Sequence, residues 1–246
     1  MLVFLLPLVL AYEAGLAFLL SDAEHGSVTT VDAHRRLVEF FAWFGIDARG
    51  GLVLGGVAIL VILLVWHVLE RQPWRIEWRD LPVMAVESMI LVLPLLGIAR
   101  VAGQMMDGQP PAAVAGVAEG MGGAGGGGGF EALSLTGRLA ISVGAGLYEE
   151  LLFRMVLIAL VHALIVDLAK GPGWLGWAVG IAISAAAFTV YHELRGAGGE
   201  LVASRVTFFA TAGVYLGVLY AARGFGIVVA VHAIYDVVVA VMLDVG

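Results

Sequence analysis

The stretch LAISVGAGLYEELLFRMVLIALVHALIVDL, residues 139–168, is apolar along most of its length but carries charged side chains near its centre. A membrane-spanning helix needs about 20 predominantly apolar residues, so this stretch is long enough to cross a bilayer with tilt or to extend beyond it. Each charged residue at the centre of such a helix costs roughly 2.5–3.5 kcal/mol on insertion. Glu149, Glu150 and Arg154 are therefore expected to face a polar interior and not lipid.

The composition of the whole chain also indicates a membrane protein. Of its 246 residues, 61% are hydrophobic and 13% are charged, whereas a soluble domain has about 25% charged residues. We therefore predict an all-α, polytopic membrane helix bundle of about seven transmembrane helices, with a polar cavity in its C-terminal half. The first span is expected to be an uncleaved helix, because it has no basic segment and carries Glu13. The predicted spans are residues 1–20, 51–69, 81–99, 139–168, 174–191, 201–222 and 225–243.

These spans predict a single integral-membrane domain over residues 1–246. It comprises N-terminal helices (1–101), a Gly-rich loop (102–134) that is either a mobile cover or a linker, and a core (136–243). Between the first two spans, VDAHRRLVEFFAWFGID (31–47) places apolar side chains at helical spacing, with charges on the other side. This pattern predicts a short amphipathic helix, either in the membrane interface or packed on the end of the bundle. The apolar side chains are Leu37, Phe40, Phe41 and Phe44.

Charge and cysteine content exclude several function classes. The formal net charge is −7 and no basic tract is present, so we expect no nucleic-acid partner. The absence of cysteine excludes a disulfide framework, a thiolate zinc site and a cysteine nucleophile. Arginine greatly outnumbers lysine, and Ala, Gly and Val are abundant, as in GC-rich bacterial genomes. We therefore expect a multi-pass protein of the bacterial inner (plasma) membrane, with the lipid bilayer as its surroundings.

The spacing of the three central charges separates their roles. Glu150 and Arg154 are four residues apart, so their side chains share a helix face and can pair. Glu149 is rotated by about 100° from Glu150, and its own neighbour four residues on is Phe153. One carboxylate is thus neutralised, whereas Glu149 stays available as a general base.

Two later spans carry polar motifs. FTVYHE (188–193) places His192 near the end of the fifth span, and HAIYD (232–236) places His232 and Asp236 on one face of the last. Three helices could therefore direct these groups and Glu149 at one buried pocket, able to activate a water molecule and stabilise an oxyanion. We expect neither a metal nor another cofactor.

Together, EELLFR (149–154), FTVYH (188–192) and HAIYD (232–236) have the forms EExxxR, FxxxH and HxxxN/D. In this order, over residues 136–243, they resemble the CAAX-protease and bacteriocin-processing (CPBP, or Abi) family. The resemblance implies a glutamate-dependent intramembrane endopeptidase that acts on a membrane-associated protein or peptide. It implies that Glu149 activates the attacking water and that His192 shares that water. It further implies oxyanion binding by His232 and Asp236, and support of the helix and cavity by Glu150 and Arg154.

The last motif differs from that of the prenyl-protease branch, and two alternative functions remain open. The prenyl-protease branch typically carries Asn in the last motif, and a carboxylate donates a hydrogen bond only when it is protonated. Asp236 is therefore either neutral or only orients His232, and a prenylated substrate does not follow. A membrane metalloprotease is the first alternative, although YHELRGA lacks the second His of HExxH. The second is a non-enzymatic scaffold, immunity protein or proton-coupled carrier, since buried carboxylates and histidines also relay protons.

Overall fold

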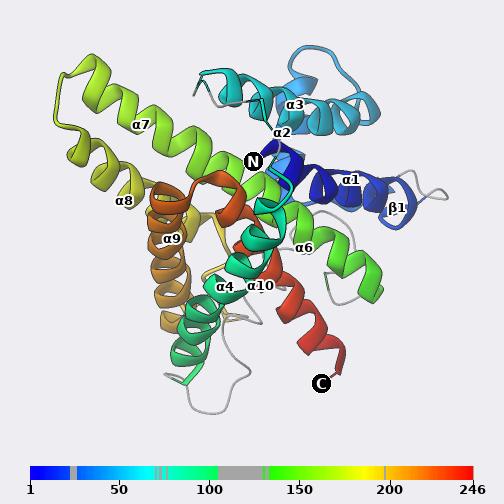
Figure 1. The fold of residues 1–246 in the computed structure, drawn as a ribbon. Helices are drawn as coiled ribbons and strands as arrows, with labels where there is room; N and C mark the ends of the chain where they lie inside the picture. The colour runs from blue at the N-terminus through cyan, green and yellow to red at the C-terminus, as the bar shows by residue number, and fades with distance from the viewer. Residues whose placement is uncertain are drawn as a thin grey trace.

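The computed structural model describes residues 1–22, 27–69, 71, 74–75, 77–104, 130, 133–196 and 198–245. Most of the predicted Gly-rich loop (102–134) lies outside these residues. The all-α prediction is confirmed, and the only strands in the described part of the chain are a two-residue antiparallel pair, β1 (Ser21–Asp22) and β2 (Ser27–Val28). The helical segments, shown in Figure 1, are α1 (Leu2–Phe18), α2 (Asp32–Ala42), α3 (Ala48–Leu69), α4 (Asp80–Gln104), α6 (Leu135–Glu150), η2 (Leu151–Ile158), α7 (Ala159–Ala163), η3 (Leu164–Leu168), α8 (Gly173–Tyr191), α9 (Ala203–Arg223) and α10 (Phe225–Val245).

By length and hydropathy, the described residues include six helices able to cross a membrane, together with the shorter apolar helix α1. At about 1.5 Å per residue, the 17 residues of α1 extend about 26 Å, slightly less than the roughly 30 Å of a bilayer core. The prediction of about seven spans is therefore confirmed as six long helices and one short one. The long spans are Gly50–Leu69, Asp80–Gln104, Leu135–Leu168, Gly173–Tyr191, Ala203–Arg223 and Phe225–Met242.

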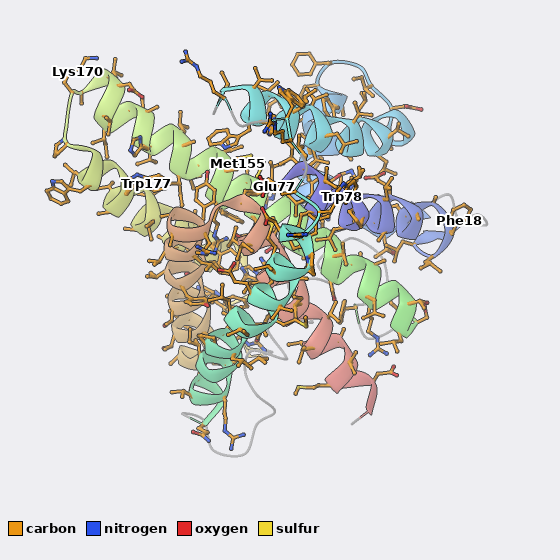
Figure 2. The ribbon with its side chains drawn as sticks, in the orientation of Figure 1. Phe18, Glu77, Trp78, Met155, Lys170 and Trp177 are labelled. Carbon is orange, nitrogen blue, oxygen red and sulfur yellow. The ribbon has the colours of Figure 1, made fainter. Side chains whose placement is uncertain are left out.

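Residues 139–168 belong to one continuous helix, Leu135–Leu168, made of α6, η2, α7 and η3. It crosses the molecule diagonally and forms, with α8, a hairpin that extends away from the other helices (Figure 1). Its outer end is apolar and exposed at Leu160, Leu164 and Leu168. Figure 2 labels Met155, which is buried, in the middle of this helix and Lys170 at the outer tip of the hairpin.

The helix α10 lies at the centre of the bundle, packed against α6, α4 and α9. Its contact with α6 is close because Gly146 has no side chain. A Cβ atom there would lie 2.8 Å from the backbone nitrogen of Ala233. Small residues of this kind let membrane helices approach closely. The close contact brings the polar motif of α10 next to the two glutamates of α6.

The predicted amphipathic helix is α2, and its two ends lie in different surroundings. Its first turn packs on the bundle, where Ala33 and His34 are buried. Its other end is exposed at Phe40, followed by Trp43 and Phe44. The first turn agrees with the alternative of a helix packed on the bundle, while the aromatic end remains free to contact the membrane interface.

Candidate active site

All six side chains singled out from the sequence come together where three helices meet: the continuous helix Leu135–Leu168, α8 and α10. Glu149 and Glu150 end α6, His192 directly follows α8, and His232 and Asp236 belong to α10. Arg154 lies in η2, one turn beyond the glutamates. All of these side chains are buried, including His192, whose side chain is 7% exposed.

Glu149 faces both histidines. Its Oε2 atom lies 3.7 Å from Nε2 of His192 and 4.0 Å from Nε2 of His232. This oxygen is buried and has no hydrogen-bond partner in the structure. Glu149 is therefore the carboxylate that remains available at the site.

The orientation of His192 is fixed by its backbone and its neighbours. Its Nδ1 atom lies 2.8 Å from the carbonyl oxygen of Phe188 and donates to it, because a carbonyl only accepts. The ring also stacks on Phe209, with centroids 4.0 Å apart. Burial lowers the pKa of His192 to about 3, so the ring is neutral near pH 7. Its Nε2 lone pair therefore points towards Glu149, and a water molecule between the two could donate to both.

His232 is held between carboxylates at both ring nitrogens. Its Nδ1 atom lies 2.6 Å from Oε1 of Glu150, and its Nε2 atom lies 3.3 Å from Oδ2 of Asp236. Glu150 also forms the predicted ion pair with Arg154, with Nε and Oε2 3.1 Å apart. The sequence predicted the pairs within one helix but not the link between Glu150 and His232.

Arg154 is fully buried, and its guanidinium lies 4.2 Å from the ring centroid of Phe188. A buried cation is stable only when it is paired, so Glu150 and this aromatic face compensate for its desolvation. The backbone around Arg154 is π-helical over Leu151–Ile158 (η2), whereas the sequence suggested an ordinary α-helix. Such π segments occur frequently at functional sites.

The polar groups line a small chamber. Glu149, His192, His232 and Asp236 contribute to its wall, and the other lining residues are apolar or aromatic, including Leu95, Leu216 and Tyr235. The volume open to the centre of a water molecule is about 20 Å³, and roughly 10–15 Å³ is needed to hold one water. The predicted polar cavity is thus a mostly apolar chamber with room for about one water molecule beside the four polar groups.

Two carboxylates that had no expected role have partners on other helices. Oε1 of Glu13 accepts a hydrogen bond from the hydroxyl of Tyr148 at 3.4 Å. Glu87 forms an ion pair with Arg223 at the end of α9, with Nη2 and Oε2 2.7 Å apart. Among the described residues, no group of three or more His, Cys, Asp and Glu side chains is placed to hold a metal ion.

The fold and the site define a polytopic membrane protein with buried glutamate and histidine side chains around a water-sized chamber. Residues 131–238 match the family model of the Rce1-like type II CAAX prenyl endopeptidases. The match includes all three motifs, and it confirms the resemblance to the CAAX-protease and bacteriocin-processing family over this segment. Comparisons of the chain with curated proteins and with solved structures found no match. In its C-terminal half, the chain is thus similar to a family of membrane proteases.

Proposed function

We propose that the protein is an intramembrane endopeptidase that cleaves a membrane-associated protein or peptide with a glutamate-activated water. The observation that carries the proposal is the placement of Glu149. Its Oε2 atom, which has no hydrogen-bond partner, lies 3.7 Å from Nε2 of His192, beside a chamber large enough for one water. The family match supports the same class of reaction, and the helices long enough to cross a membrane support its location in the bilayer.

In the proposed reaction, the water donates one hydrogen bond to Glu149 and one to His192. As the water oxygen attacks the scissile carbonyl carbon, Glu149 takes a proton and the carbonyl oxygen becomes an oxyanion. The same proton then passes to the leaving nitrogen while the carbon–nitrogen bond breaks. The products are a carboxyl terminus and an amine, and Glu149 returns to its initial state.

The oxyanion would lie on the His232 side of the chamber. Nδ1 of His232 is engaged by Glu150, so Nε2 is the ring atom that would donate a hydrogen bond towards the oxyanion, and it would share that hydrogen with its present contact, Asp236. Asp236, 3.3 Å from that nitrogen, would orient the ring and donate only when it is protonated. Glu150 and Arg154 would hold the ring and the helix in place.

The substrate class proposed is a C-terminal tail, a sorting signal or a leader peptide that reaches the bilayer. We further propose that the chain acts as one domain in the bacterial inner membrane. Residues 136–243 would carry the catalysis, without a cofactor and without a nucleic-acid partner.

The test compares the purified wild type with Glu149→Ala in mild detergent, on a library of membrane-anchored peptide tails. Cleavage is read by mass spectrometry, with and without a strong chelator. Glu193→Gln serves as a matched control, because Glu193 is an exposed carboxylate next to His192. Cleavage that resists the chelator, persists in the control and disappears in Glu149→Ala supports the proposal. Cleavage abolished by the chelator would favour the metalloprotease, and cleavage unaffected by Glu149→Ala would refute the role of this glutamate.

A further inference from the structure

We infer that the N-terminal end of α2 positions the Glu149–His192 pair, with His34 as the principal positioning residue. The inference rests on the proposed function, in which this pair binds the attacking water. It concerns a helix outside residues 131–238, the segment that matches the family. The inference is based on the contacts of α2 with α6 and α8.

His34 packs directly on the residue that precedes Glu149. Its side chain is fully buried, and its ring lies parallel to that of Tyr148, with centroids 4.4 Å apart and 5° between the planes. The Tyr12 hydroxyl lies 3.0 Å from Nδ1 of His34 and 2.7 Å from Oγ1 of Thr30. The imidazole is thus held from α1 while its face supports α6 at the position next to Glu149.

A second contact, from the start of the next turn of α2, reaches the residue that precedes His192. The guanidinium of Arg36 lies 5.8 Å from the ring centroid of Tyr191. The Tyr191 ring also meets Phe153 of η2 edge-on, with centroids 5.2 Å apart. Two residues at the start of α2 therefore contact the residues directly before Glu149 and His192. A shift of this end of α2 would therefore change the 3.7 Å separation between those two side chains.

Glycines on two other helices leave room for this arrangement. A Cβ atom at Gly55 of α3 would overlap Nε2 of His34, and a Cβ atom at Gly144 of α6 would overlap the ring of Tyr12. Gly55 thus offers a way to displace His34 by a change on a helix that contributes nothing to the chamber wall. Misplacement of catalytic groups by about 1 Å can cost about 100-fold in rate.

The experiment measures kcat and KM of the full chain in detergent on a peptide cleaved by the wild type. The variants are Gly55→Ala, His34→Ala and their combination. The control is Gly97→Ala, where a Cβ atom meets nothing within 4 Å. We expect each single variant to lower kcat about 10- to 100-fold with KM within about twofold. The double variant should match His34→Ala alone, because the overlap at Gly55 acts on the imidazole.

Two further measurements separate positioning from loss of folding and from failure of the proposed function. His34→Phe keeps a ring over Tyr148, so it should recover most of the kcat lost in His34→Ala. Hydrogen exchange of residues 147–150 and 189–193 needs no substrate, and it should rise in Gly55→Ala and His34→Ala but not in Gly97→Ala. Unchanged kcat in folded Gly55→Ala and His34→Ala would overturn the inference. If the wild type cleaves no peptide, the proposed function fails, and unchanged exchange in these two segments would then overturn the positioning role separately.

Discussion

Nδ1 of His232 lies 2.6 Å from Oε1 of Glu150, although the two residues are 82 positions apart in the chain. Glu150 also pairs with Arg154, so a continuous set of charged contacts runs from η2 through α6 to α10. Glu150 therefore does more than neutralise a neighbouring cation. It connects the buried guanidinium to the imidazole expected to face the substrate.

Replacing Glu150 by Gln removes the negative charge between Arg154 and His232 while keeping the side-chain size. Loss of one partner from a buried ion pair typically costs about 3–5 kcal/mol, because the other charge stays buried without compensation. We expect a clear fall in the thermal unfolding midpoint in detergent. Adding Arg154→Met should restore part of the lost stability. A Glu150→Gln variant as stable as the wild type would contradict this account of the buried pair.

The Glu149→Gln variant tests the general base without changing its shape. Glu149 makes no hydrogen bond through Oε2, so the amide should disturb the fold little. The loss of a general base typically costs about 10²- to 10⁴-fold in rate. We expect kcat to fall within this range, with an unfolding midpoint close to that of the wild type. Residual activity above a tenth of the wild-type kcat would argue against the proposed role.

Asp236 can be probed by comparing its replacement by Asn with its replacement by Ala. If the carboxyl only orients His232, the amide oxygen introduced by Asp236→Asn can accept the same hydrogen bond, and the amide nitrogen adds a donor. This variant should therefore keep kcat within about tenfold of the wild type. Asp236→Ala leaves His232 without this partner, so it should lose about 10²- to 10³-fold, as expected for a disturbed oxyanion site. Equal losses in both variants would show that the charge of Asp236 itself is needed.

His34 predicts a specific acid sensitivity of the fold. Burial lowers its pKa from 6.5 to about 4, against a smaller opposing effect of the Leu52 backbone. The unfolded chain therefore binds a proton near pH 6.5, whereas the folded protein does so only near pH 4. Stability from this residue is present above pH 6.5 and is lost as the pH falls towards 4. Thermal unfolding at pH 7 and pH 5 should thus show a smaller decrease in His34→Phe than in the wild type, and equal decreases would count against a buried neutral imidazole.

The spans could be predicted because insertion into lipid depends on the local run of apolar residues. The predicted helix at 174–191 corresponds to α8 (Gly173–Tyr191), and the one at 225–243 to α10 (Phe225–Val245). The Glu150–Arg154 pair was predictable for a similar reason, since residues four positions apart stay neighbours along one helix.

The contacts between helices could not be predicted in this way. The stacking of His34 on Tyr148 and the bond between Glu150 and His232 depend on which helices lie next to each other. A single sequence does not show which helices are neighbours in the bundle. The π-helical backbone of η2 was missed because Leu151–Ile158 has the composition of an ordinary apolar helix.

The continuous helix Leu135–Leu168 makes bilayer thickness a variable in any assay of this protein in lipid. At the α-helical rise of about 1.5 Å per residue, 34 residues would extend about 51 Å, and the π-helical segments η2 and η3 shorten this length somewhat. The helix is still longer than a hydrocarbon core of about 30 Å. Its outer leucines are apolar and exposed, so keeping them in lipid requires the helix to tilt strongly or the surrounding membrane to thicken. Glu149 lies on this same helix. Lipids of different chain length would therefore change the mechanical strain on the helix that carries Glu149. Detergent micelles would remove much of this strain.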